Sequence, residues 1–365
     1  MPELIIEQDP SERPSVTRRV LLRGLGIAAA TVAVVGVGEI WSALRAPPDQ
    51  TRVLRVAFLV TDLFSPITQY GIGVIRDALH DLGFGPGRIA YQLVDADRDS
   101  TRFPAVAEQV VALSPDVIIC QGHHAALALK AATRTIPVVF LTPGVNPVVV
   151  GIVRSFSRPG GNLTGITTDD DQIHAKQLQL LKECVPAISR VAIVRDKFEP
   201  PQAIIETQSA AQSLGIQILA IDLVAVGELD AGLLTAAAWH ADALVQTQAA
   251  HSMIDVSGGS RIADFALKRR WPSFTTGNVA GLLSYSSSAY ELETWQRAAK
   301  HVDRILRGAD PAVLPVEILS GSRFIVNLCT AAQLELSVPQ SVLEQAVYIS
   351  RPPGEQFAQL CRPQR

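Results

Sequence analysis

The sequence has few cysteines and no pattern among them that would build a metal centre. The four cysteines lie far apart, without a CxxC pair or a Cys/His ligand spacing, so we expect no metal site. Cys120, Cys184 and Cys329 are expected as buried thiols, although their spacing leaves a disulfide open. Cys361 is expected as a free thiol in a polar tail. The net charge is −3 and no basic stripe with interleaved aromatics is present, so nucleic acid is not an expected partner.

Signature motifs of the common enzyme classes are also missing. The chain contains no GxSxG elbow, HExxH helix, P-loop or GxGxxG turn. No coupled acid/base pair is identifiable either. We therefore expect that the protein is not an enzyme, and that it has no catalytic residue, no cofactor and no metal ion.

Apolar runs long enough to cross a bilayer comfortably are absent. The run Leu25–Gly38 is short for a membrane span, and Glu39 interrupts it. Because the basic segment Thr17–Arg23 precedes this run, residues 1–51 are predicted to be an export signal and linker. The paired arginines in that segment resemble a twin-arginine signal, which implies a periplasmic protein. An uncleaved anchor and a buried or membrane-lying helix are the alternatives. Contact with the membrane is expected only through this segment or through a membrane partner.

The chain does contain a repeated alternation of apolar runs and helical segments. Within Pro115–Gly165, the runs Val117–Cys120 and Val138–Leu141 flank an alanine-rich helical segment, Ala125–Thr133. Continuous apolar runs bounded by turn residues are typical of strands buried on both faces. Their alternation with helices predicts right-handed βαβ units in a parallel sheet. The predicted fold class is therefore α/β.

The second half of the chain repeats the pattern of the first half. Arg190–Asp196 resembles Arg55–Asp62, and Ala241–Gln246 resembles Pro115–Cys120, in the same order. We interpret this as a duplication that gives two similar Rossmann-like lobes with parallel sheets. The predicted organisation is a signal, anchor and linker at 1–51, lobe 1 at 52–166 plus 275–314, lobe 2 at 167–274 plus 315–350, and a tail at 351–365.

Near the end of the chain, two short alternating runs are harder to assign. Val316–Leu319 and Phe324–Leu328 are separated by a few polar residues, and we predict that they pair as a hairpin.

Polar residues follow the predicted strands at the edge where ligands collect in parallel sheets. For His123 and His124, which follow a buried strand, ligand contact, capping or surface exposure, and metal binding or catalysis are all open. The carboxylates of Asp169–Asp171 are expected mainly to cap the helix that starts at Ile173, and binding of an ammonium group by one of them is the alternative. Ser284 and Tyr285 are expected to end another strand. Such turns can also be merely solvated.

All of these groups lie at strand ends, and this shared position favours a role in ligand binding over simple exposure to solvent. Uncharged hydrogen-bonding types dominate, which suits reversible capture of a small polar or zwitterionic molecule in a cleft. The expected ligand-binding residues are Asp62, Ser65, Gln121, His123, His124, Pro143, Gly144, Asn146, Asp169, Asp196, Gln246, Asn278 and Ser284.

Several blocks of the chain closely resemble the substrate-binding proteins of bacterial ABC transporters, the family that includes tryptophan-binding lipoproteins. The blocks ATRTIPVVF (132–140), SRPGGNLTG (157–165) and VDRILRGADPAVLPVE (302–317) carry the resemblance, which extends over roughly residues 52–347. It implies a type I periplasmic-binding fold with two lobes joined by a multi-strand hinge. The implied crossings lie near Gly165–Thr168, Phe274–Gly277 and Pro315–Ser320.

The same resemblance implies a function and its partners. A small-molecule ligand would be trapped by closure of the lobes, and an ABC permease and ATPase would take it up. The family usually has Gly-Thr or Gly-Ser at Gly122-His123 and Asp-Pro-Val at Asn146-Pro147-Val148, so the ligand is expected to differ, with an amino acid as the best analogue. A ligand-sensing module that serves a separate receptor or kinase is the alternative function.

Overall fold

The computed structural model describes residues 52–97, 99–142, 144–168, 173–199, 201–247, 250, 261–276, 281–286, 288–319, 323–346 and 348–350. The predicted export signal and linker at 1–51 and the tail at 351–365 lie outside these ranges. Within them, every helix is too short or too polar to cross a lipid bilayer.

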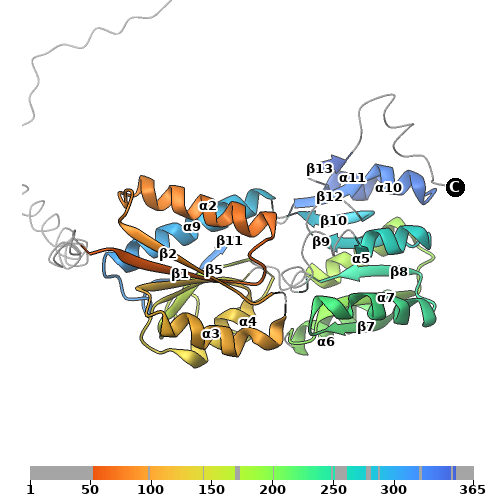
Figure 1. The fold of residues 1–365 in the computed structure, drawn as a ribbon. Helices are drawn as coiled ribbons and strands as arrows, with labels where there is room; N and C mark the ends of the chain where they lie inside the picture. The colour runs from red at the N-terminus through yellow and green to blue at the C-terminus, as the bar shows by residue number, and fades with distance from the viewer. Residues whose placement is uncertain are drawn as a thin grey trace, which may run out of the picture. The chain divides into compact units, whose positions relative to one another are not determined.

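Lobe 1 is a six-stranded parallel sheet with helices on both faces (Figure 1). The strand order is β11-β5-β4-β3-β1-β2. The strands are β1 (Leu54–Val60), β2 (Ile89–Asp95), β3 (Val117–Gln121), β4 (Val138–Thr142), β5 (Leu163–Thr168) and β11 (Glu317–Leu319). The helices are α2 (Pro66–Asp81), η1 (Ser100–Arg102), α3 (Phe103–Ala112), α4 (His123–Ala132) and α9 (Ser288–Leu306).

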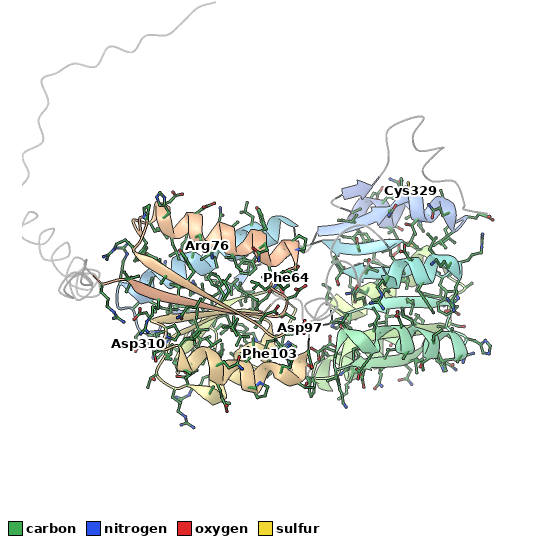
Figure 2. All side chains as sticks on the ribbon, viewed as in Figure 1. Phe64, Arg76, Asp97, Phe103, Asp310 and Cys329 are labelled. Carbon is green, nitrogen blue, oxygen red and sulfur yellow. The ribbon has the colours of Figure 1, made fainter. Side chains whose placement is uncertain are left out.

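The alternation of side chains along β1 explains why this sheet needs two layers of helices. Val56 and Phe58 face the core beneath α2 and α9, whereas Ala57 and Leu59 face the core beneath α3 and α4. Successive side chains of a strand point to opposite faces, so a strand that is apolar at every position must be covered on both sides. Side chains fill both layers (Figure 2). Burial of each large apolar side chain contributes about 1.5–3 kcal/mol.

Lobe 2 is a seven-stranded sheet in the order β13-β12-β10-β9-β8-β6-β7, with β12 antiparallel to β10. The strands are β6 (Arg190–Asp196), β7 (Gln217–Leu223), β8 (Ala243–Gln246), β9 (Ser273–Thr276), β10 (Leu283–Ser286), β12 (Arg323–Asn327) and β13 (Tyr348–Ser350). The helices are α5 (Ile173–Cys184), α6 (Pro201–Ser213), η2 (Val226–Glu228), α7 (Leu229–Ala238), α10 (Leu328–Gln333) and α11 (Gln340–Gln345).

The predicted duplication is confirmed by the order of the strands. Lobe 1 contains the run β2-β1-β3-β4-β5, and lobe 2 contains the run β7-β6-β8-β9-β10. Corresponding strands therefore occupy corresponding places, with β1 and β6 each between two parallel neighbours. This doubly wound order places the carboxyl ends of the central strands at one edge of each sheet.

The predicted hairpin near the end of the chain is wrong. β11 pairs with β5 in lobe 1, whereas β12 pairs with β10 in lobe 2. The segment 283–286 also lies in the lobe 2 sheet, and 317–319 lies in the lobe 1 sheet, which is the opposite of the expected assignment. The reason is that α9, between them in sequence, buries Trp295 and Val302 in the lobe 1 core and carries β11 there with it.

The chain passes between the lobes at three places, two of which agree with the expected crossings. Gly165–Thr168 is part of β5, and the crossing follows it. Phe274–Thr276 is part of β9 inside the lobe 2 sheet, and the chain instead leaves lobe 2 after β10. The third crossing follows β11, within the expected Pro315–Ser320 region.

The cysteines are also partly different from expectation. Cys120 and Cys184 are buried free thiols as expected, and burial raises the pKa of both, that of Cys184 to about 12. Such thiols are poor nucleophiles at neutral pH. Cys329 is disulfide-bonded, which is the alternative that its spacing leaves open. Cys361 lies outside the described residues.

Helix α2 approaches α9 closely at a glycine. A Cβ atom added to Gly71 would lie 2.0 Å from Cε2 of Trp295, a side chain that is itself buried in the lobe 1 core. Gly73, two residues further along the same helix and therefore on a different face, has nothing within 4 Å of its hypothetical Cβ. The two glycines therefore differ in packing while sharing the same helical backbone.

We predict opposite effects for alanine at these two positions. Gly71→Ala should lower the free energy of unfolding by about 1–3 kcal/mol because the indole ring must shift in a packed core. Gly73→Ala should raise it by up to about 1 kcal/mol because alanine favours the helix. Urea unfolding followed by circular dichroism measures both changes. A destabilised Gly73→Ala, or an unaffected Gly71→Ala, would contradict the packing described here.

Candidate functional site

The carboxyl ends of the lobe 1 strands carry several of the predicted site residues. Asp62 follows β1, is buried, and accepts a hydrogen bond from the backbone N–H of Phe64 at 2.9 Å. Ser65 is the N-cap residue of α2, without a side-chain capping bond. Gln121 ends β3, and its Oε1 accepts a hydrogen bond from the hydroxyl of Thr68 at 3.3 Å. These groups lie where the sequence predicts them.

The two histidines lie at the start of α4 because of the glycine before them. Gly122 has a φ of 88°, a left-handed conformation that favours glycine, and this turns the chain directly from β3 into α4. His123 and His124 are the first two residues of the helix. The His123 side chain is 3% exposed and that of His124 is 15% exposed, so neither is the surface histidine that the sequence left open.

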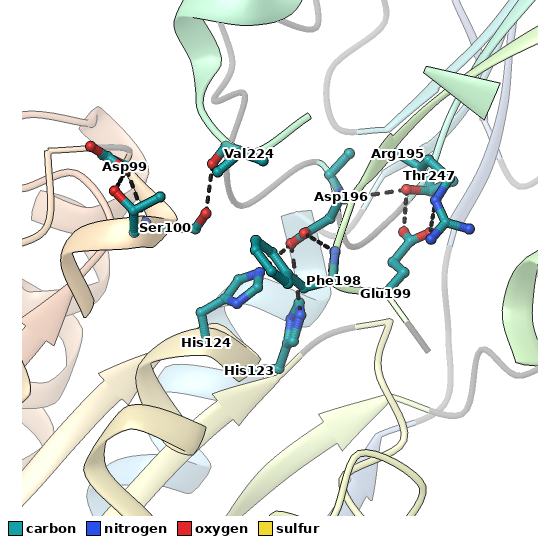
Figure 3. Close-up of polar contacts among 12 residues, drawn as sticks. Asp99, Ser100, His123, His124, Arg195, Asp196, Phe198, Glu199, Val224 and Thr247 are labelled. Atoms are coloured by element: carbon teal, nitrogen blue, oxygen red, sulfur yellow. Dashed lines mark hydrogen bonds and ion pairs between the residues drawn. The ribbon is translucent and has the colours of Figure 1, made fainter. Parts of the chain in front are cut away.

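Asp196, at the end of β6, brings a carboxylate from lobe 2 to these histidines (Figure 3). Nε2 of His124 lies 2.5 Å from Oδ2 of Asp196, and the imidazole donates because an ionised carboxylate only accepts. Nε2 of His123 lies 3.7 Å from the same oxygen. The other oxygen, Oδ1, accepts a hydrogen bond from the backbone N–H of Phe198 at 2.8 Å. Three predicted site residues from two lobes therefore form one cluster.

Two aromatic rings pack against His124 in this cluster. The ring of Phe103 stacks on His124 with centroids 6.0 Å apart, and Phe198 meets it edge-on at 5.2 Å. The two imidazoles lie 4.0 Å apart. Burial, and secondarily the neighbouring His124, lowers the pKa of His123 to about 4 against the opposing effect of Asp196. His123 is therefore neutral at pH 7, and its Nε2 has no hydrogen-bond partner among the described residues.

The donor atoms of His123, His124 and Asp196 all lie within 4.8 Å of one another. Two imidazole nitrogens and a carboxylate oxygen are ligand types suited to divalent transition metals. The arrangement can therefore act as an ion pair between the lobes or as a set of metal ligands.

A second contact joins the lobes beside this cluster. The hydroxyl of Ser100 donates a hydrogen bond to the carbonyl oxygen of Val224 at 2.6 Å (Figure 3). The neighbouring residues Asp99 and Ala225 form an isolated antiparallel bridge. These four residues lie at the starts of the short helices η1 and η2, which occupy equivalent places in the two lobes.

Behind Asp196, lobe 2 contains a buried charged network that sequence reasoning missed in part. The hydroxyl of Thr247 donates to the carboxyl group of Glu199, and Nε of Arg195 lies 3.8 Å from Glu199 and 2.9 Å from Asp222. Burial raises the pKa of Glu199 to about 7 despite Thr247 and Arg195. This network connects the turns that follow β6 and β8. Glu199 and Thr247 lie just beyond the ends of β6 and β8, and this position is the sequence signal that identifies them.

Four buried polar side chains at strand ends have atoms without a hydrogen-bond partner among the described residues. They are the hydroxyls of Thr142, Thr275 and Thr276 and the Nε2 of Gln246, which lie at or beside the ends of β4, β9 and β8. Oε1 of Gln246 faces the backbone N–H of Thr276 at 3.5 Å, and its backbone oxygen accepts from Gln177 at 3.3 Å. Both lobes thus present unpaired hydrogen-bonding groups at their carboxyl edges.

Several predicted site residues have other roles or places. Oδ1 of Asn146 accepts the backbone N–H groups of Val148 and Val149, so it closes a turn after β4. The backbone N–H of Gly144 donates to the hydroxyl of Thr168 at 2.7 Å. Pro143, Asp169 and Asn278 lie outside the described residues.

The expected strand end at Ser284 and Tyr285 is confirmed to within one residue, because β10 ends at Ser286. Ser284 is buried inside β10, paired with Thr275 on one side and Ile325 on the other. The ring of Tyr285 packs 5.0 Å from that of Phe274 in the lobe 2 core. The strand extends further than the apolar run in the sequence, because neighbours on both sides supply its hydrogen bonds.

Comparison with known proteins agrees with this geometry. The model of the family described as ABC transporter substrate binding protein matches residues 67–349. A curated tyrosine-binding protein of Clostridioides difficile (strain R20291) is 30% identical over 123 residues, which are 33% of this chain and 35% of that protein. The matched region thus spans about a third of that relative's length.

Solved structures resemble the whole two-lobed region. The ABC domain from Streptococcus pneumonia in complex with L-Trp has a TM-score of 0.69 and 20% identity, covering 82% of this chain and 100% of that chain. A conserved domain protein from Vibrio cholerae has the same TM-score and coverage, with 22% identity. These similarities show a type I periplasmic binding fold. With the family model matching well over half of its length, the chain belongs to the family of ABC transporter substrate binding proteins.

Proposed function

We propose that this protein is the extracytoplasmic solute-binding component of an ABC importer and that it captures an amino acid between its two lobes. The observation that carries the proposal is the set of unpaired, buried polar atoms at the carboxyl ends of β4, β8 and β9. A buried polar group without a partner costs about 1–3 kcal/mol, which a bound polar solute recovers by pairing with it. Because the groups come from both lobes, one small molecule can satisfy several of them.

The chemistry of these groups favours an uncharged or zwitterionic solute. Thr142, Gln246 and Thr276 offer hydroxyl and amide groups, which donate and accept hydrogen bonds without adding charge. An α-amino acid presents an ammonium group and a carboxylate that such groups can bind together. Relatives named for tyrosine and for L-Trp support an amino acid as the solute class.

Closure of the lobes would couple binding to transport. A ligand that touches both lobes stabilises the closed arrangement by its differential affinity for it. The contacts from His124 to Asp196 and from Ser100 to Val224 would form or break with that motion. The crossings after β5, β10 and β11 would absorb the backbone change. An ABC permease and its ATPase would then recognise the closed form.

The proposed location follows from the N-terminal sequence. The basic segment Thr17–Arg23 and the apolar run Leu25–Gly38 support export to the periplasm by the twin-arginine route. Retention of this segment as an anchor would keep the protein at the membrane beside its permease.

We predict that the purified protein binds one amino acid per chain. Mass spectrometry of a denatured preparation from the native host should detect a co-purified amino acid. After its removal, L-Trp, L-Tyr or another amino acid should raise the unfolding temperature in proportion to occupancy. If neither release nor stabilisation by any amino acid is found, the proposed solute class is wrong.

We also predict that Thr142→Val and Thr276→Val each weaken binding of the amino acid without lowering the stability of the ligand-free protein. Each change removes a buried hydroxyl without a partner, so the free energy of unfolding of the ligand-free protein should stay constant or rise by up to about 1 kcal/mol. The affinity for the amino acid should fall about tenfold if the hydroxyl binds it, which calorimetric titration measures.

Thr207→Val is the matched control. The hydroxyl of Thr207 is buried in α6 and donates to the carbonyl oxygen of Ala203 at 2.6 Å, so its loss should cost about 1 kcal/mol of stability and leave affinity unchanged. Unchanged affinity in both of the strand-end variants would show that their hydroxyls do not contact the solute.

A further inference from the structure

We propose that His123, His124 and Asp196 form a binding site for a divalent transition-metal ion, with Zn²⁺ as the best-suited species. The three donors come from the start of α4 in lobe 1 and from the end of β6 in lobe 2. This inference goes beyond the proposed capture of an amino acid and does not depend on it.

The distances between donor atoms suit one small cation. In a tetrahedral site with bonds of about 2.0–2.2 Å, donor atoms lie about 3.3–3.6 Å apart. Nε2 of His123 lies 3.7 Å from Oδ2 of Asp196, close to that value. Nε2 of His124 lies 2.5 Å from the same oxygen, a hydrogen bond whose proton a metal ion would replace. The adjustment needed is a separation of His124 from Asp196 by about 1 Å.

The surroundings hold the donors in place. The backbone N–H of Phe198 binds Oδ1 of Asp196 and leaves Oδ2 directed at the histidines (Figure 3). The ring of Phe103 stacks on the imidazole of His124, and the ring of Phe198 meets the same imidazole edge-on. Such an outer shell fixes the orientation of metal ligands.

An ion pair alone does not account for both histidines. His124 already provides the partner of Asp196, whereas His123 lies beside it with a buried Nε2 that lacks a hydrogen-bond partner among the described residues. A cation that accepts electron pairs from both imidazoles would use that atom. Nitrogen donors with one carboxylate favour Zn²⁺, Co²⁺ or Ni²⁺ over Mg²⁺, which prefers oxygen donors.

Three protein ligands leave a fourth position for water or for another molecule. Because the ligands belong to two lobes, the ion would also stabilise the arrangement that brings them together. Metal binding is thereby coupled to the relative position of the lobes.

Titration with the metal alone tests the proposal. The full chain, without a histidine tag, is treated with a chelator and then titrated by calorimetry with ZnCl₂, and with MgCl₂ as a comparison. We expect about one Zn²⁺ per chain and no binding of Mg²⁺ at the same concentrations. Co²⁺ should give the visible absorption bands of a four-coordinate site.

Variants assign the site. His124→Gln, His123→Gln and Asp196→Asn should each weaken Zn²⁺ binding by roughly tenfold or more. His80→Gln is the matched control, because that imidazole is 62% exposed and far along α2, and it should change nothing. Circular dichroism checks that each variant is folded. Equal Zn²⁺ affinity in wild type and in the three site variants would overturn the proposal, as would the absence of binding to wild type.

A measurement on the unmodified protein covers the case in which a variant fails to fold. X-ray absorption at the zinc edge should show two imidazoles and an oxygen at about 2.0–2.2 Å. A spectrum with oxygen ligands alone, or with one imidazole, would mean that Zn²⁺ binds elsewhere and would overturn the proposal. Because no amino acid is added, failure of this test leaves the proposed solute capture unaffected.

Discussion

Burial of both faces of β1 and β6 is the constraint on which the rest of the structure depends. Each of these strands lies between two parallel neighbours, and its apolar side chains are covered by helices on either side of the sheet. Polar residues on such a strand have a place only at its ends, so the residues that follow the central strands are delivered to one edge of each sheet. In lobe 1 this edge carries Gln121 and the two histidines, and in lobe 2 it carries Asp196 and Gln246. The chemistry of the candidate site is thus a consequence of how the apolar layers pack.

The carboxylate of Asp196 shows how this edge connects the lobes. The residue is fully buried, and a buried carboxylate is tolerated only when it is paired and hydrogen-bonded. One of its partners, the N–H of Phe198, belongs to its own lobe, whereas the other, His124, belongs to lobe 1. Separation of the lobes would return Asp196 and His124 to water, so much of the Coulombic gain is offset by solvation. The contact therefore specifies an orientation of the lobes more than it adds stability, which suits a protein whose family binds and releases solutes.

Much of the fold could be predicted from the sequence, and the limits have physical causes. The strands β3 and β4 have continuous apolar runs, and their predicted bounds agree with the structure to within one residue. The separate pairings of β11 with β5 and of β12 with β10 could not be predicted, because local patterns do not say that α9, which precedes β11, joins the lobe 1 core. The cluster of His123, His124 and Asp196 required knowledge of how the lobes approach, which no spacing in the chain encodes. Asn146 is predicted to bind the ligand, and the structure adds that its Oδ1 caps a turn, for which Asn-Pro is a sequence signal.

The threonines of lobe 1 show that a buried hydroxyl without a hydrogen-bond partner is a feature of the strand end and not of threonine in this sheet. Thr164 donates its buried hydroxyl to the carbonyl oxygen of Leu314, and Thr167 donates to that of Thr142. These hydroxyls tie β5 to its neighbours, as expected for polar groups inside a sheet. The hydroxyl of Thr142 is just as buried, yet it has no partner among the described residues. Since the residue type and the degree of burial are the same, the difference comes from position: Thr142 ends β4 at the carboxyl edge, where ligands collect in parallel sheets. A group left unpaired there makes the free protein less stable than it could be, and the same group makes binding of a polar partner more favourable.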